Sequence, residues 1–121
     1  MIALEYLSLK CVRSATSPLG TEYDVALLTN GRNRKGFYSL GEGEVVDLSR
    51  SYNYGIEPNT PNTRWRFTLE KQTAAFTGDT EVTTIWRADY EGDSNFLFTK
   101  RTLHFDNEGD YAFSYRFVDL P

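Results

Sequence analysis

The fold is decided most clearly by residues 95–118, NFLFTKRTLHFDNEGDYAFSYRFV. In the second half of this stretch, aromatic residues alternate with small or charged ones, which is the period of two expected of an extended strand. The first half, Asn95–His104, alternates in the same way, and a Gly-containing turn, Asp106–Gly109, separates the two halves. Two alternating segments around a short turn predict a β-hairpin. Its inward-facing aromatic residues are predicted to be Phe96, Phe98, Tyr111, Phe113, Tyr115 and Phe117.

Shorter alternating segments precede the hairpin, separated by turns rich in Gly, Pro and Asn. They predict strands over Ala3–Val12, Glu22–Thr29, Lys35–Leu40, Glu44–Ser49, Arg64–Lys71 and Thr80–Ala88. The pair Asn30–Gly31 tolerates the positive φ of a tight hairpin turn. The segment Arg50–Thr63 contains Pro58 and Pro61 and is expected to be the longest irregular connection. No window has the apolar spacing and caps of a long helix, so none is expected.

These segments favour an all-β fold. About eight short strands at roughly 8–12-residue spacing are typical of a sandwich or jelly roll. The chain has 121 residues, which suits a single hydrophobic core. The sequence therefore predicts one antiparallel β-sandwich or jelly roll over residues 1–121, with a small β-barrel as the alternative.

The composition argues against several classes of protein. The formal net charge of −4 disfavours a nucleic-acid binder, because contacts to phosphates need clustered Lys and Arg. No stretch approaches the roughly 18 apolar residues of a membrane-spanning helix, so we expect no transmembrane segment. Glu5 and Lys10 interrupt the N-terminal segment, which does not resemble a signal peptide. These features favour a cytoplasmic location.

The single cysteine, Cys11, excludes an internal disulfide. It is in phase with Leu7 and Leu9, so all three side chains are expected on the inner face of the first strand. We therefore interpret Cys11 as a small core residue, which is where most free cysteines lie.

Two loops are rich in carboxylates, Asp89–Asp93 and Asp106–Asp110. Carboxylate oxygens are the ligands that calcium prefers. The strand predicted between the loops separates them by roughly 30 Å at about 3.3 Å per residue, so they cannot share an ion. Antiparallel alternation places the second loop at the same end as Glu42, Glu44 and Asp79. The candidate metal ligands are Asp79, Asp106 and Asp110, although Asp, Asn and Gly are also ordinary turn residues.

The opposite end of the predicted sandwich is basic and aromatic. Arg offers forked hydrogen-bond donors and Tyr a flat amphipathic ring, a combination suited to recognising a protein or a glycan. The competing interpretation is a solvated basic turn beside an irregular loop. The candidate binding residues are Arg32, Arg34, Lys35, Arg50, Tyr52 and Tyr54.

Residues typical of catalysis are sparse. His104 is the only histidine, and no Gly-x-Ser-x-Gly turn accompanies it. We therefore predict that the protein is not an enzyme and needs no cofactor, with calcium as the alternative. The leading hypothesis is a non-enzymatic binding module that contacts a protein or glycan partner through its polar and aromatic loops, as a monomer or a homo-oligomer.

Two other functions stay open at the level of the sequence. One is a calcium-dependent β-sandwich that binds lipid or carbohydrate, motivated by the acidic loops. The other is a structural protein that assembles by pairing its edge strands with further copies of itself.

Overall fold

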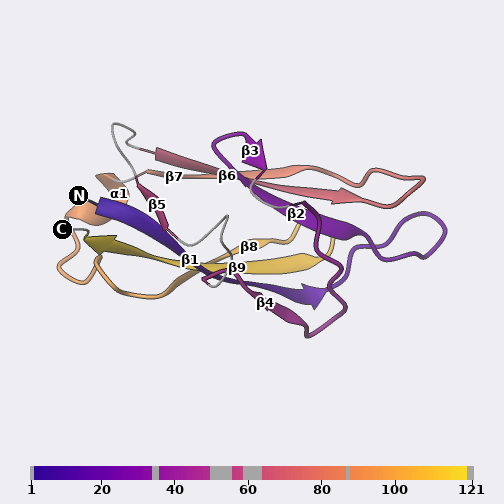
Figure 1. Ribbon diagram of the computed structural model, residues 1–121, viewed down its shortest axis with the longest axis horizontal. Helices are drawn as coiled ribbons and strands as arrows, with labels where there is room; N and C mark the ends of the chain where they lie inside the picture. Colours follow the sequence, from indigo (N-terminus) through magenta and orange to yellow (C-terminus); the bar gives the residue numbers. More distant parts are fainter. Residues whose placement is uncertain (1, 34–35, 50–55, 59–63, 87, 120–121) are drawn as a thin grey trace.

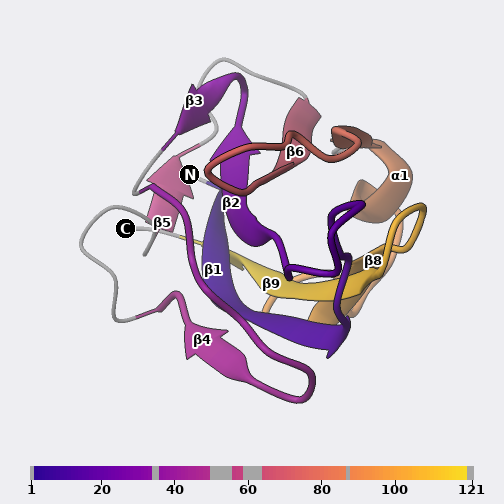
Figure 2. The ribbon, with the colours of Figure 1, turned by 90° about the vertical axis from the view of Figure 1, so that its right-hand side faces the viewer.

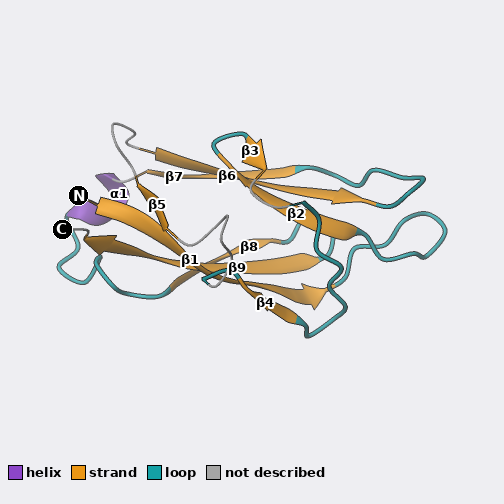
Figure 3. Cartoon of the chain, in the orientation of Figure 1, coloured by secondary structure: helices purple, strands orange, loops and turns teal. Residues whose placement is uncertain are grey.

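The computed structural model describes residues 2–33, 36–49, 56–58, 64–86 and 88–119. Its order of elements is β1 (Ile2–Arg13), β2 (Asp24–Thr29), β3 (Arg32–Asn33), β4 (Val45–Asp47), β5 (Ile56–Pro58), β6 (Arg64–Gln72), β7 (Glu81–Trp86), α1 (Ala88–Glu91), β8 (Arg101–Phe105) and β9 (Asp110–Asp119). Strands dominate the molecule, and α1 is a short helix at one end (Figure 3). The predicted all-β class and the absence of a long helix among the described residues are therefore confirmed.

The strands form two antiparallel sheets that pack face to face (Figure 1). One sheet has the order β4-β1-β9-β8, with β5 also paired to β1, and the other has the order β3-β2-β6-β7. An end-on view shows β2 and β6 on one side of the core and β1 and β9 on the other (Figure 2). The sheets do not join into a closed barrel, which confirms the predicted sandwich.

Strands β1 and β9 form the centre of the larger sheet and pair along nearly their whole length. The four aromatic residues predicted to point inward from β9 are buried, and they are Tyr111, Phe113, Tyr115 and Phe117. They pack on the inward side chains of β6: the Phe67 and Phe113 ring centroids lie 4.9 Å apart, as do those of Trp65 and Phe117. Ring pairs at this distance add to the burial of apolar area, so this aromatic layer holds the two sheets together.

A β-bulge in β1 changes its inner face. The pairing with β9 shifts register between Tyr6 and Ser8, which leaves Leu7 as the extra residue. Leu9 and Cys11 are buried as expected, but before the bulge the side chains that enter the core cluster are Leu4 and Tyr6, and Leu7 is only partly buried. The expectation of one unbroken phase through Leu7, Leu9 and Cys11 was wrong because one inserted residue inverts the alternation.

The strand predicted over Asn95–His104 is mostly irregular. Only Arg101–Phe105 forms β8, because α1 and a turn precede it and the Asp93 carboxylate accepts the N–H of Asn95. Phe96 packs against Phe117, but Phe98 has a φ of 61° and is 57% exposed, so its predicted inward position was wrong. The alternation of aromatic residues over Asn95–His104 thus marked a segment in which some side chains pack on the sheet, although most of the segment is not a strand.

Two other segments differ from their predictions. The described part of the expected strand Lys35–Leu40 pairs with β2 only at Tyr38, through mutual backbone hydrogen bonds with Val25. The connection Arg50–Thr63 contains the short strand β5, which pairs with the beginning of β1. No helix among the described residues has the length and apolar character that crossing a membrane requires.

Candidate functional site

Most of the predicted basic and aromatic site lies outside the described residues. This applies to Arg34, Lys35, Arg50, Tyr52 and Tyr54, while Arg32 is described by its backbone alone, as the first residue of β3. Arg32 pairs with Thr29, directly after the tight turn at Asn30 and Gly31, both of which have positive φ. This turn therefore sets the backbone of Arg32 beside the end of β2.

The Asn30 turn is fixed against the first residues of β6. The N–H of Asn30 donates to the Arg66 carbonyl at 2.8 Å, and the N–H of Arg66 donates to Asn30 Oδ1 at 3.0 Å. Asn tolerates the left-handed conformation that this turn requires, and its side chain extends the β2–β6 pairing by one contact. The Asn30–Gly31 turn thus lies beside Arg66.

An exposed strip follows on the outer face of β6 and β7, and we call it the Arg–Trp face. Its members are Arg64, Arg66, Val82, Thr84 and Trp86, all of them exposed. Strand register sets Arg64 beside Trp86 and Arg66 beside Thr84. The Arg64 guanidinium lies 5.6 Å from the centroid of the Trp86 ring, within reach of a cation–π interaction. Positive charge and flat aromatic surface are therefore adjacent on one sheet face.

The sequence predicted a strand over Arg64–Lys71 but did not include Arg64 and Arg66 in the candidate site. The alternation of β6 gave the correct faces, with Trp65, Phe67 and Leu69 buried. The missing information was the pairing partner, because only the register of β7 brings Trp86 next to Arg64. A signal for it existed in the sequence, since Ile85 and Trp86 are consecutive and cannot both point inward from one strand.

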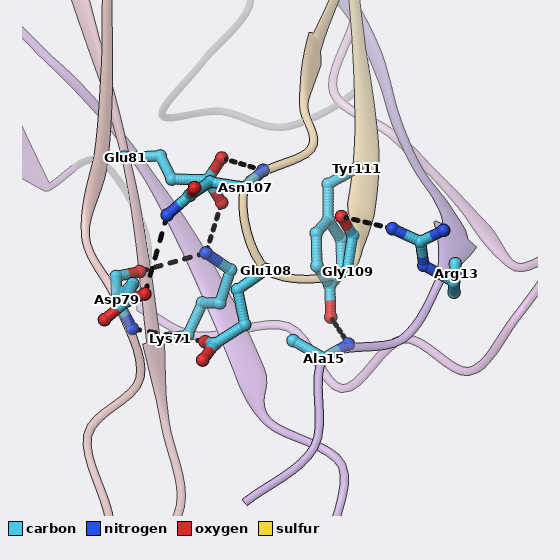
Figure 4. A network of polar contacts seen from close by, with 9 residues as sticks. All are labelled: Arg13, Ala15, Lys71, Asp79, Glu81, Asn107, Glu108, Gly109 and Tyr111. Atoms are coloured by element: carbon cyan, nitrogen blue, oxygen red, sulfur yellow. Dashed lines mark hydrogen bonds and ion pairs between the residues drawn. The ribbon is translucent and has the colours of Figure 1, made fainter.

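A second cluster joins the two sheets at the other end of β7 (Figure 4). Lys71 is fully buried, and its Nζ donates to the Glu81 carboxylate and, at 2.9 Å, to the Asp79 carbonyl. The N–H of Asn107, in the β8–β9 turn, donates to Glu81 Oε1 at 2.8 Å. The N–H of Asp79 donates to Glu108 Oε1 at 3.2 Å. Since β6 and β7 belong to one sheet and the turn to the other, this Lys71–Glu81 cluster connects the two sheets through polar contacts.

The three predicted metal ligands have different surroundings. Asp79 belongs to the Lys71–Glu81 cluster, where its carboxylate accepts a hydrogen bond from the Asn107 side-chain amide at 3.5 Å. The Asp110 carboxylate is 2.7 Å from Nδ1 of His104, and Asp106 is exposed. Among the residues that the structure describes, no three His, Cys, Asp or Glu side chains are arranged to hold a metal ion. Calcium binding at these residues stays the alternative to a protein that needs no cofactor.

The other acidic loop, Asp89–Asp93, forms α1 and the turn after it. The Arg101 guanidinium lies 4.3 Å from the Tyr90 ring centroid and forms an ion pair with Asp93 at 3.4 Å. The pKa of Asp93 is lowered, first by the hydrogen bond from the Asn95 N–H and then by Arg101. Helix α1 lies at the opposite end of the sandwich from the Lys71–Glu81 cluster (Figure 1). The two acidic loops are therefore far apart as expected, although β8 is shorter than the strand predicted between them.

Buried tyrosines between the sheets are held in the neutral form. Burial raises the pKa of Tyr111 to about 12, and its hydroxyl accepts the N–H of Ala15 at 3.1 Å. Burial also raises the pKa of Tyr115, whose hydroxyl is 3.4 Å from that of Tyr90. Neither hydroxyl is poised to act as an acid or base near neutral pH, so both are best understood as structural groups.

The sequence matches no protein-family model, and no curated protein is significantly similar to it. The function therefore has to be argued from the geometry alone, and the Arg–Trp face is the described surface that most needs a functional explanation.

Proposed function

We propose that the protein is a non-enzymatic binding module whose Arg–Trp face contacts an acidic segment of a partner protein. The observation that supports this proposal is the contrast between its two tryptophans. Trp65 is fully buried in the aromatic layer, whereas Trp86 is 46% exposed on the outside of the same sheet. A large aromatic ring at the surface stabilises the fold little, but it is one of the side chains that contribute most to protein–protein affinity.

The charges around Trp86 favour an anionic partner. Arg64 and Arg66 project from alternate positions of β6, and within the described residues neither of them forms an ion pair. The chain as a whole carries a net charge of −4, so this face is a local exception to an acidic surface. The forked guanidinium group binds carboxylates through two parallel hydrogen bonds, which favours Asp and Glu side chains as its targets.

A protein is favoured over a glycan by the combination of side chains. Trp and Arg are both enriched among the residues that dominate protein interfaces. Val82 and Thr84 continue the strip with apolar and hydroxyl surface, which gives the polar-and-apolar mixture of an ordinary interface.

The proposal is tested by surface binding to immobilised poly-L-glutamate, polygalacturonate and uncharged dextran at low salt. The parent is compared with Arg64→Gln/Arg66→Gln and with a control, Lys10→Gln/Arg13→Gln, which removes two exposed positive charges from β1. We expect the parent to bind poly-L-glutamate and the first variant to bind more than about tenfold more weakly, since truncating one important interface arginine typically costs about 2 kcal/mol. The control variant should bind as the parent does, and added salt should weaken binding.

Three results would contradict the proposal. In the first, the parent does not bind poly-L-glutamate at low salt. In the second, both double variants lose the same amount of affinity, and in the third, added salt does not weaken binding. Preferential binding of polygalacturonate, lost with Arg64 and Arg66, would reassign the face to an acidic glycan.

A further inference from the structure

Strand β7 is an edge strand. It pairs with β6 on one side, and no described strand pairs with it on the other. Proteins usually protect such edges with Lys, Pro or a bulge, because the unpaired backbone groups can pair with another chain. The sequence Val82–Trp86, VTTIW, has none of these features and consists of residues that favour strands.

The unpaired backbone groups can be identified from the neighbouring strands. The N–H and C=O of Arg66 both bond to Asn30, on the side away from β7. Arg66 and Thr84 are directly paired, so they form a non-hydrogen-bonded pair and the N–H and C=O of Thr84 point out of the sheet edge. By the period of two, the same holds for Val82 and Trp86.

The side chains at these three positions are exposed on the outer face of the sheet. Val82 and Trp86 are 48% and 46% exposed, and Thr84 lies between them. The edge thus combines free backbone groups with apolar surface at the same residues. Together they have the features of a strand that is completed by another strand.

We propose that two copies of this chain pair antiparallel through β7, with Thr84 opposite Thr84 of the second copy. This register makes each Val82 face Trp86 of the other copy, because the two positions are equally spaced about Thr84. The three resulting pairs are all of the hydrogen-bonded type, so every outward N–H and C=O of Val82, Thr84 and Trp86 obtains a partner. A register centred on Thr83 would join fewer of these groups and would set Glu81 opposite Ile85.

Charge favours a second copy as the occupant. Two copies of a protein with a net charge of −4 repel each other, but the segment Val82–Trp86 carries no formal charge. Two copies can therefore meet along this strand without placing like charges opposite each other. The contact is symmetric, as a two-fold interface requires, since the same residues contribute from both sides.

The paired sheets would align the Arg–Trp faces of both copies on one surface. Arg66, Thr84, Thr84 of the second copy and Arg66 of the second copy would form one row across the sheet. At about 4.8 Å between strands, the two Arg66 backbones would be about 14 Å apart. The proposed dimer does not rest on the proposed function. The mass of the protein and its binding of poly-L-glutamate are measured in separate experiments, so either proposal can fail without the other.

Sedimentation equilibrium over a range of concentrations tests the proposal. The parent should approach twice the chain mass of 13.9 kDa. Thr84→Lys and Thr84→Glu should each be monomeric, because both set like charges directly opposite each other, and a mixture of the two variants should dimerise again. Thr102→Lys, on the edge strand β8, is the matched control and should leave the dimer intact.

Thr84 is exposed, so these variants should retain the parent circular dichroism spectrum. If Thr84→Lys does not fold, Trp86→Lys replaces it, because that change removes the contact with Val82 of the other copy. The proposal is overturned if the parent remains a monomer at its highest concentration. It is also overturned if the Lys and Glu variants dimerise alone, or if their mixture stays monomeric.

Discussion

Replacing Glu81 by Gln tests whether the Lys71–Glu81 cluster holds the two sheets together. Gln keeps the size of the side chain and one oxygen for the Asn107 N–H, but it removes the negative charge that faces Lys71. The Lys71 side chain has no exposed surface, and that of Glu81 is 10% exposed, so water cannot readily replace the lost charge. The amide of Gln would also direct its own N–H donors toward an ammonium that can only donate.

The expected loss follows from the burial of the pair. Removing one partner of a buried ion pair costs roughly 3–5 kcal/mol, because the other charge remains buried without compensation. Glu81 retains slight exposure and Lys71 retains the Asp79 carbonyl, so we expect the lower end, about 3 kcal/mol. In a Lys71→Met background, the same Glu81→Gln change should cost less than about 1 kcal/mol, since no buried ammonium is left.

The assay is equilibrium urea unfolding followed by tryptophan fluorescence, to which the buried Trp65 contributes, applied to the parent, both single variants and the double variant. Glu70→Gln is the control, because it removes a carboxylate from the outer face of β6, the strand of Lys71, and should change stability by no more than about 0.5 kcal/mol. A loss in Glu81→Gln that equals the control, or that is the same with Met at position 71, would refute the role of the cluster.

Two further predictions concern a glycine and a metal. Gly109 has a φ of 73°, and a Cβ there would lie 2.7 Å from backbone atoms of Arg13 and Ala15, so Gly109→Ala should cost about 3 kcal/mol or more. Gly20→Ala, at a similar φ but with nothing within 4 Å, should cost only about 1 kcal/mol in the same urea titration, and equal losses would contradict this reasoning. Millimolar calcium should leave the melting temperature unchanged, because Asp79 and Asp110 already contact Asn107 and His104, and a calcium-dependent rise in scanning calorimetry would show the opposite.

The sequence predicted the fold well where one face of a strand is buried and the other exposed. Strands β6 and β9 follow this rule, because a simple alternation determines which side chains enter the core. The rule failed at Leu7, where a bulge inverts the alternation, and at Phe98, where a preceding turn redirects the chain. Neither event leaves a periodic signal, since each depends on the pairing partner or on one side-chain hydrogen bond.

The candidate site was less predictable than the fold for the same reason. The sequence correctly grouped Asp79 with the Asp106–Asp110 turn, but it gave no indication that a buried lysine would connect them. Lys71 follows Leu69 on the inner face of β6, a position where a charged residue is rare without a partner. Its partner, Glu81, is ten residues away and is identified only by the register between β6 and β7.

The thiol of Cys11 makes local opening of β1 measurable. The chain contains one cysteine, and its side chain has no exposed surface. Its backbone N–H and C=O are bonded to Glu44 and Gly43, so a reagent can reach the thiol only when this part of β1 opens. When opening and closing are faster than the chemical reaction, the rate of thiol labelling measures the free energy of that local opening. The interior of the sandwich can therefore be monitored in the native state without introducing a probe.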